Sequence, residues 1–417
     1  MKNNKQGGQI PLIKNKKTPA DSEPFRRYLG PLFLLMSLFF LNFGGRVVPA
    51  PLAPVIEKDL GLTHAEAGSL FLLVYVGYFI TLISSGLLSS RITHRQTIIL
   101  STTALGIALL VTPLSTGVWS LRLCLWLVGV AGGFYLPSAI STLTDIVPVR
   151  HWGKAIAIHE LAPTLGFILT PLISEIVIYW FSWRSVFLFL GFFGLLQALV
   201  FRRFGRGGSF LGEPPKPKTL RSLFVMPSYW LMIILFSLGV SGTLGTFTML
   251  PLYLVTEHAM ERSWANTLIS LSRLSSVAMA LVGGWFSDRF GPRRTMMIVF
   301  LVTGALTMLL GSASRSWIAV IVFLQPLTAV CFFPAGFAAL SQITSSEVRH
   351  IAVAFTTPFA VLVGGGLIPT LIGFVGDVHS FALGIALLGG FIMAGAAFAP
   401  FLRFRSAPQQ VPMPHGR

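Results

Sequence analysis

Long apolar stretches separated by short polar joints make up most of this chain of 417 residues. A membrane-spanning helix needs about 20 consecutive, mainly apolar residues, whereas the strands of membrane β-barrels alternate apolar and polar positions over about 10 residues. The unbroken stretches therefore predict an all-α membrane protein with twelve transmembrane helices. We expect the spans at 29–54, 66–89, 96–115, 118–144, 153–180, 184–203, 228–255, 265–287, 295–313, 316–343, 351–376 and 380–402.

One polar segment, 204–227, is rich in Gly, Pro and Lys and divides the spans into two groups of six. Such a composition is typical of a linker. The sequence thus predicts five parts. They are a basic cytoplasmic tail at 1–27, a six-helix bundle at 28–203, a cytoplasmic linker at 204–227, a second six-helix bundle at 228–403 and a cytoplasmic tail at 404–417.

The two halves repeat each other weakly. Residues 86–91 (GLLSSR) align with 284–289 (GWFSDR) at an offset of 198, and Pro171 and Pro369 share that offset. Parallel repeats of six spans characterise one class of transporter folds, in which the binding site lies between the halves near the middle of the membrane. We therefore expect two pseudo-symmetric bundles with a site between them.

The charges are few and unevenly placed. Only 11% of the residues are charged, whereas a soluble domain has about 25%. The net charge of +17 could indicate nucleic-acid binding, but Lys and Arg gather in the N-terminal tail, in the linker and after the last span. This distribution follows the positive-inside rule. We expect a monomer in the lipid bilayer of a bacterial inner membrane, with both termini cytoplasmic and no nucleic-acid partner.

Two arginines lie deep inside predicted spans, Arg46 in the first and Arg273 in the eighth. A charged side chain near the middle of the bilayer costs about 2.5–3.5 kcal/mol on insertion scales, so it normally faces a water-filled cavity or an opposite charge. The guanidinium fork suits anions, because it can bind two oxygens at once. Asn42 lies four residues before Arg46 on the same helix face, and Tyr75 is the repeat counterpart of Arg273. We expect these four side chains to bind a small anionic substrate.

A different interpretation of the arginines stays open, in which a buried glutamate neutralises them internally. Glu160, preceded by His159, lies about two turns into the fifth span and is the obvious candidate. Burial disfavours the charged form of a carboxyl group, and histidine titrates near neutral pH. Both residues are therefore candidates to carry a coupled proton, with a structural hydrogen bond as the alternative.

Residues 284–294 (GWFSDRFGPRR) form the most distinctive motif of the chain. It resembles the cytoplasmic motif that follows span 2 or span 8 in the major facilitator superfamily. Residues 183–187 (WRSVF) and 129–134 (GVAGGF) resemble further elements of that superfamily. The resemblance implies a fold of two six-helix bundles and secondary active transport by alternating access.

The motif has a physical rationale as a gate. Gly284 allows two helices to approach closely, and Asp288 can accept hydrogen bonds from a helix N-terminus or pair with an arginine. In the first half, Ser90 and Thr93 replace the acidic residue and the second glycine, so we expect a stronger latch in the second half. The alternative is that the arginines only set topology. The candidate gating residues are Gly284, Asp288, Arg289, Gly291 and Arg293.

The resemblance to individual subgroups is partial. Organophosphate antiporters carry a basic residue on span 1, which Arg46 resembles, and monocarboxylate and oxalate-type carriers carry one on span 8, which Arg273 resembles. We expect a proton-coupled carrier of a small organic anion, either a carboxylate or a phosphate ester. The alternatives are an anion antiporter without proton coupling, a proton-driven drug or metabolite efflux pump, and a non-transporting receptor. The sequence has no recognisable catalytic, cofactor or metal motif, so we expect no enzyme, no cofactor and no metal site.

Overall fold

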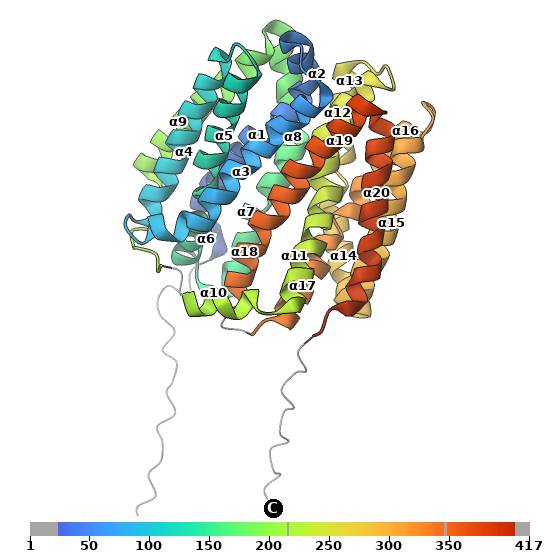
Figure 1. The fold of residues 1–417 in the computed structure, drawn as a ribbon. Coiled ribbons are helices and arrows are strands. Elements are labelled where there is room, and N and C mark those ends of the chain that lie inside the picture. The colour runs from blue at the N-terminus through green and yellow to red at the C-terminus, as the bar shows by residue number, and fades with distance from the viewer. Residues whose placement is uncertain (1–23, 215–216, 346–347, 405–417) are drawn as a thin grey trace, which may run out of the picture.

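The computed structural model describes residues 24–214, 217–345 and 348–404. The described part is almost entirely helical, and its helices form two bundles that lie side by side (Figure 1). The predicted tails at 1–27 and 404–417 fall outside the described residues, except for the stretch 24–27 and Phe404.

The first bundle contains the first six spans. Its helices are η2 (Phe25–Tyr28), α1 (Leu29–Val47), α2 (Pro49–Leu60), α3 (His64–Ser89), α4 (His94–Val111), η3 (Thr112–Leu114), α5 (Val118–Gly133), α6 (Tyr135–Ile146), η4 (Val149–His151), α7 (Trp152–His159), α8 (Leu161–Trp180) and α9 (Trp183–Phe204).

The second bundle follows the short helix α10 (Pro217–Phe224). Its helices are α11 (Pro227–Val240), η5 (Ser241–Gly245), α12 (Thr246–Thr256), α13 (Arg262–Ser272), α14 (Ser276–Phe290), α15 (Pro292–Ser312), α16 (Ile318–Ala329), α17 (Phe332–Ile343), α18 (Arg349–Val361), η6 (Leu362–Leu367), α19 (Ile368–Val378), α20 (Phe381–Phe398) and η7 (Ala399–Phe401).

Eleven helical stretches in the described residues are long and apolar enough to cross a membrane, and they coincide with eleven of the predicted spans. The remaining predicted span, 265–287, is built from α13 and α14, which a turn at residues 273–275 separates. Together the two helices form the eighth span in chain order, which brings the number of spans in the described residues to twelve. Its interruption falls at Arg273, one of the two intramembrane arginines, so the polar side chain and the irregular backbone coincide.

Several other spans are interrupted near the middle of the molecule. The first span breaks between α1 and α2 at Val48, and the fifth breaks between α7 and α8 at Glu160. The seventh and eleventh spans contain the π-helical segments η5 and η6, which pack against each other. π-Helical turns are rare, and they occur frequently at functional sites.

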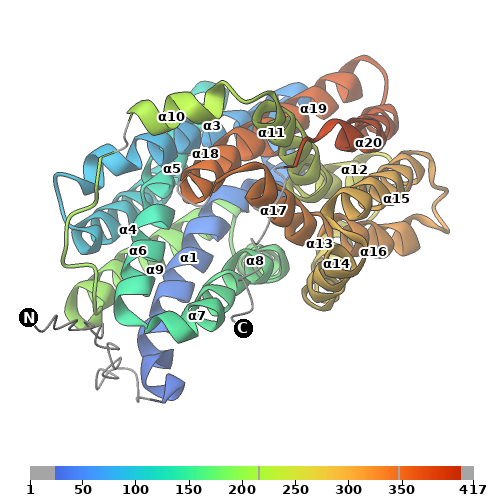
Figure 2. The same ribbon diagram turned by 90° about the horizontal axis from the view of Figure 1, so that it is seen from below.

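The two bundles meet chiefly at the upper end of the molecule in Figure 1, opposite the lower end where α10 lies. There α2 packs on α12, α8 packs on α13, and α3 packs along α19 and η6. Towards the lower end α3 also contacts α18, but the described residues show no comparable packing of α6 or α7 on α14 or α17. Figure 2, seen from below, shows α7 of the first bundle apart from α14 of the second. The bundles are therefore closed together at the upper end and separated at these lower helices.

Part of the predicted linker folds onto the first bundle. Backbone hydrogen bonds join His94 N–H to the Phe210 carbonyl (3.1 Å) and Gly212 N–H to the Ser89 carbonyl (2.7 Å). The Phe210 ring also lies edge-on to the His94 ring, with 4.9 Å between the centroids. This strap covers the loop between α3 and α4, where the sequence lacks the acidic residue and the second glycine of the motif.

Candidate functional site

Arg46 occupies the last turn of α1 and is almost completely buried, with 3% of its surface exposed. Its guanidinium carbon lies 4.1 Å from the centroid of the Tyr78 ring and 5.4 Å from that of Phe43. Its Nε donates a long hydrogen bond (3.3 Å) to the backbone carbonyl of Asn42, one helical turn earlier. Aromatic faces attract the cation but leave its net charge in place.

Asn42 lies on the same face of α1 as Arg46, as predicted. Its Nδ2 donates to the backbone carbonyl of Gly132 on α5 at 3.0 Å. A Cβ at Gly132 would lie 3.4 Å from that amide nitrogen and 3.5 Å from Cδ of Arg46. These are ordinary van der Waals distances, so Gly132 lies directly beside both side chains.

Arg273 lies in the turn after α13, and 4% of its surface is exposed. Its Nη2 donates to the backbone carbonyl of Thr243 in η5 at 3.2 Å. Its guanidinium carbon lies 4.9 Å from the ring centroid of Phe167 and 5.3 Å from that of Phe247. The Nε atom is buried and has no hydrogen-bond acceptor. A buried donor without an acceptor costs about 1–3 kcal/mol, so this atom is suited to receive an oxygen of a ligand.

Three phenylalanines connect the two arginines. The Phe43 ring, which lies beside Arg46, is edge-on to Phe167 with 4.9 Å between centroids. Phe167 is in turn edge-on to Phe247 at 4.6 Å, and both rings lie beside Arg273. We call Phe43, Phe167 and Phe247 the aromatic bridge. It crosses from the first bundle to the second, so the structure brings the two predicted arginines to one cluster. These three rings were not predicted as site residues from the sequence, because no local pattern distinguishes them from the other phenylalanines of the spans.

Neither guanidinium has a carboxylate within 4 Å among the described residues. Glu160, the expected internal partner, instead lies beside His159. The Nδ1 atom of His159 is 3.2 Å from a carboxylate oxygen of Glu160. The expectation that Glu160 is buried is wrong, because 48% of its side chain is exposed. Glu160 lies at the joint between α7 and α8, and α7 shows no comparable packing on helices of the second bundle in the described chain.

His159, in contrast, is completely buried. Its ring stacks on Phe39 with 4.6 Å between centroids and an angle of 10°. Its Nε2 lies 3.4 Å from the hydroxyl of Tyr135, which donates to the carbonyl of Leu35 at 2.6 Å. The imidazole therefore connects the half-exposed Glu160 carboxylate to the interior of the first bundle.

Tyr75, the repeat counterpart of Arg273, lies where the two bundles meet. A Cβ at Gly365 in η6 would lie 2.8 Å from the Tyr75 ring, so this glycine makes room for it. Its hydroxyl is buried without a hydrogen-bond partner, and so is that of Ser270, three residues before Arg273. Both hydroxyls are thus buried polar groups that lack a partner within the described residues, as is Nε of Arg273.

The predicted gating residues lie at the lower end of α14 and the start of α15. Gly283, rather than the predicted Gly284, is the glycine of close approach. A Cβ at Gly283 would lie 2.7 Å from the Cα of Cys331, whereas one at Gly284 would meet only Pro334 at 3.9 Å. Gly291 has φ 83° and ψ 151°, a conformation essentially restricted to glycine.

The acidic residue of the motif is not engaged in this conformation. Asp288 is exposed and has no ion pair in the described part of the chain. Arg289 lies beside Trp285 and Phe290 at 5.7 and 5.9 Å. Arg293 donates through Nη2 to the Leu402 carbonyl and lies 4.8 Å from the Phe404 ring. The motif is thus positioned at the lower end with its carboxylate free to bind elsewhere.

At the upper end, carboxylates do join the two bundles. Glu175 on α8 accepts hydrogen bonds from Arg262 (2.8 Å) and Asn266 on α13. Asp377 at the end of α19 accepts from the backbone N–H groups of His64 and Ala65, both at 2.8 Å. We call these contacts the upper latch. Spacing along the sequence gave no signal for it, since each carboxylate finds its partners in the other bundle.

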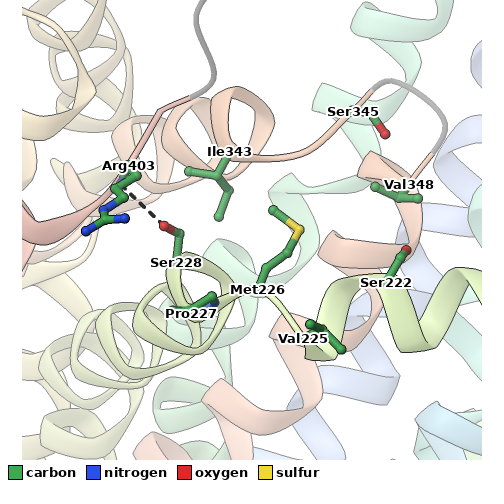
Figure 3. Close-up of a pocket in the computed structure, with 9 residues that line it drawn as sticks. All are labelled: Ser222, Val225, Met226, Pro227, Ser228, Ile343, Ser345, Val348 and Arg403. Atoms are coloured by element: carbon green, nitrogen blue, oxygen red, sulfur yellow. Dashed lines mark hydrogen bonds between the residues drawn. The ribbon is translucent and has the colours of Figure 1, made fainter.

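A cavity of about 500 Å³ lies at the lower end of the second bundle (Figure 3). It is lined by the start of α11, the ends of α10 and α17, and Arg403, whose backbone N–H donates to the Ser228 hydroxyl at 3.3 Å. Neither Arg46 nor Arg273 nor any residue of the aromatic bridge lines it, so it is separate from the candidate site.

Comparisons with known proteins agree with this architecture. The family model described as "Major Facilitator Superfamily" matches residues 35–272 and 258–414. A probable L-galactonate transporter of Escherichia coli K12 is 21% identical over 85% of this chain and 93% of its own length. The 4-hydroxybenzoate transporter of Pseudomonas aeruginosa is 23% identical over 73% of this chain and 77% of its own length.

Among solved structures, a bacterial homologue of the human lysosomal transporter Spinster, described as inward-facing and occupied, superimposes with a TM-score of 0.78. The sequence identity is 18%, over 91% of this chain and 97% of that one. At this identity the likeness establishes a common fold of two six-helix bundles, and no shared substrate follows from it.

Proposed function

This chain belongs to the Major Facilitator Superfamily, and from that premise we propose that it carries a small organic anion, a carboxylate or phosphate ester, by alternating access. It is a multi-pass membrane transporter, because the family and the relatives are transporters. For the same reason it is not an enzyme, as expected from the sequence. The substrate, its ligands and the coupling ion are the proposed part.

The observation that carries the proposal is the pair of buried arginines that have no carboxylate within 4 Å among the described residues. Arg46 comes from the first bundle and Arg273 from the second, and the aromatic bridge connects them. Leaving two cations in a membrane interior is unfavourable, and an anion bound between them removes that penalty. Because such an anion would attract both bundles, it would also favour the rearrangement that exposes the site to the other side.

The packing of the bundles at the two ends of the molecule supports a proposal for the side of the membrane to which this conformation is open. The positive-inside distribution supports a cytoplasmic position for both termini and, with them, for the lower end. The upper latch then closes the outer side, while α6 and α7 stand apart from α14 and α17 at the inner side. We therefore assign an inward-facing conformation to this structure, in a bacterial inner membrane.

We further propose that His159 and Glu160 carry a coupled proton. The imidazole links the carboxylate to the buried Tyr135 hydroxyl, so a proton taken up at Glu160 would change the hydrogen bonding beside α1, the helix that bears Arg46. The half-exposed carboxylate also favours a second candidate, anion exchange without proton coupling, because a group open to solvent needs no partner to stay ionised.

The test is the thermal stability of the purified protein in detergent with mono- and dicarboxylates, phosphate esters, nitrate and lipophilic cations. A ligand that binds only the folded protein stabilises it by about 2.7 kcal/mol at a hundredfold excess over Kd. We expect one class of organic anions to stabilise the wild type and not the Arg273→Ala variant. Stabilisation by lipophilic cations alone would reject anion transport and favour drug efflux.

A further inference from the structure

The π-helical segment η5 offers two neighbouring backbone carbonyls to side chains from other helices. The Gly242 carbonyl accepts a hydrogen bond from Nε2 of Gln325 at 2.7 Å, and the Thr243 carbonyl accepts one from Nη2 of Arg273 at 3.2 Å. Gln325 lies on α16, whereas Arg273 follows α13. The two carbonyls are consecutive in the chain, and the peptide units that carry them are planar. A shift of the Gly242 carbonyl therefore also moves that of Thr243.

The side chain of Gln325 is itself firmly held. It is buried, and its Nε2 also donates to the Thr307 hydroxyl on α15 at 3.2 Å. A side-chain amide nitrogen has two N–H donors, so these two bonds use both of them. Because a backbone carbonyl can only accept, the nitrogen and not the oxygen of the amide must face Gly242. Gln325 thus fastens η5 to α15 and α16.

The orientation of Arg273 depends on η5 in turn. The bond to the Thr243 carbonyl is the one hydrogen bond that its guanidinium makes among the described residues. The rings of Phe167 and Phe247 lie 4.9 and 5.3 Å from the guanidinium carbon. Ring faces attract a cation, but a hydrogen bond is strongly directional. The position of the Thr243 carbonyl therefore fixes the direction in which the other N–H groups of Arg273 point.

We propose that Gln325 is a positioning residue for anion binding, which acts on Arg273 through the Gly242 and Thr243 carbonyls of η5. Gln325 and Arg273 both donate to η5, so Gln325 acts by holding the acceptor that orients the guanidinium. A guanidinium binds two oxygens of an anion at once only when its fork faces them. An Arg273 that can turn freely then binds an anion less tightly. The inference rests on the proposed function, because it takes Arg273 as the ligand of the anion.

The first experiment observes Arg273 without any ligand. Nuclear magnetic resonance of the protein with isotope-labelled arginine, purified in detergent, measures how fast the side-chain N–H groups exchange with water, and Arg273→Lys identifies the signals of Arg273. Gln325→Met keeps a long unbranched side chain but removes the donor. We expect the Arg273 N–H groups to exchange about tenfold faster in Gln325→Met than in the wild type, because the Thr243 carbonyl is no longer held in place.

The second experiment measures affinity by calorimetry, with lactate as the carboxylate probe and glycerol phosphate as the phosphate-ester probe. For the probe that binds the wild type, Gln325→Met should raise Kd about tenfold, which corresponds to about 1.4 kcal/mol. Tyr253→Phe is the matched control, because it also removes a buried hydrogen bond to a backbone carbonyl of the same bundle, that of Leu310 on α15 at 2.8 Å. It should lower stability but leave Kd and the exchange of Arg273 unchanged.

A second variant keeps the question open to test if Gln325→Met does not fold. Thr307→Val removes only the hydroxyl that Gln325 also binds, so the amide keeps its bond to Gly242 alone. We expect a smaller rise in Kd and a smaller increase in the exchange rate than in Gln325→Met.

The outcomes separate positioning from a merely structural role. If folded Gln325→Met or Thr307→Val is less stable but keeps the wild-type Kd and the wild-type exchange of Arg273, the inference is overturned. If no organic anion binds the wild type, the proposed function fails. In that case faster exchange in Gln325→Met still supports the hold of Gln325 on Arg273, and equal exchange rejects it.

Discussion

At the scale of single residues, the chain keeps two cations in its interior and surrounds them with aromatic rings instead of carboxylates. Contact with ring faces contributes about 2 kcal/mol for a desolvated cation, which lessens the penalty of burial without neutralising the charge. A carboxylate partner would compete with an anionic substrate for the N–H groups of the arginine, whereas an aromatic ring leaves those groups unbonded. The absence of a carboxylate within 4 Å of Arg46 or Arg273 in the described chain is therefore what anion binding requires.

Replacing either arginine should abolish transport without unfolding the protein. Hydrogen bonds to charged groups contribute about 1.5–3 kcal/mol each, so losing two of them lowers affinity by roughly a hundredfold or more. Uptake of the labelled anion into proteoliposomes by Arg46→Ala and Arg273→Ala measures this. Arg122→Ala is the control, because Arg122 also lies beside a ring (Trp119, 4.6 Å) and donates to the Ser69 hydroxyl, but at the upper end of the first bundle. Wild-type rates in either variant would exclude that arginine from the site.

Glu160→Gln should uncouple transport from the proton gradient. The amide cannot exchange a proton, so accumulation against a concentration gradient is lost, but counterflow exchange of the substrate persists because the arginines are intact. The measurement compares both activities in proteoliposomes with an imposed pH gradient. Glu66→Gln, which alters only the capping box of α3, should retain both. Full accumulation by Glu160→Gln would remove Glu160 from the coupling role.

At the scale of elements, the interruptions of the spans coincide with the site. Arg273 ends α13, Glu160 separates α7 from α8, and the π-helical η5 offers the Thr243 carbonyl to Arg273. A carbonyl inside a regular α-helix already accepts one hydrogen bond within the helix, although it can accept a second one, as the Gly132 carbonyl does from Asn42. Irregular backbone at membrane depth is tolerated where it is buried in protein or lines a cavity, and here it surrounds the two arginines.

Gly291 shows what one residue contributes to an element. Its φ of 83° with ψ of 151° lets the chain leave α14 and enter α15, and a side chain in this region costs about 1–3 kcal/mol. Gly291→Ala should destabilise the protein by that amount, measured by reversible unfolding in detergent. Gly390→Ala on α20 is the control, since a Cβ there meets nothing within 4 Å. Equal stability of the two variants would show that the loop relaxes.

At the scale of the whole molecule, the upper latch holds the bundles together on one side only. Asp377 reaches from α19 to the first N–H groups of α3, where the helix dipole also favours a negative charge. Alternating access requires these bonds to break when the upper end opens. The exposed Asp288 at the lower end is placed to form the reciprocal contact in the other state, and this remains a prediction.

Asp377→Asn should shift the population towards the state that is open at the upper end, by about tenfold if about 1.4 kcal/mol of latch energy is lost. Distance distributions between spin labels on α2 and α12 would measure the shift. Asp59→Asn is a matched control, because Asp59 pairs with Arg184 within the first bundle at the same end (2.7 Å). An unchanged distribution in Asp377→Asn would remove this carboxylate from the latch.

Much of the fold could be predicted from the sequence, because the solvent preference of each segment is a local property. Runs of about 20 apolar residues define the spans wherever they fold, and eleven appear as single helical stretches near the expected positions. The motif at 284–294 and the six-plus-six arrangement identified the family. The buried arginines were visible for the same reason, since a charge in an apolar run is conspicuous without a structure.

Only the tertiary structure decided which side chains from distant segments are in contact. Phe167 is one of 35 phenylalanines, and nothing in its local sequence distinguishes it from rings that face lipid. Glu160 was expected to be buried and is half exposed, because its burial depends on whether the second bundle covers α7. Gly283 rather than Gly284 closely approaches the backbone of Cys331, just before α17, since helix rotation sets which neighbour faces the contact. Depth in the membrane follows from the sequence of one segment, whereas contacts across two bundles follow from packing among segments far apart in the chain.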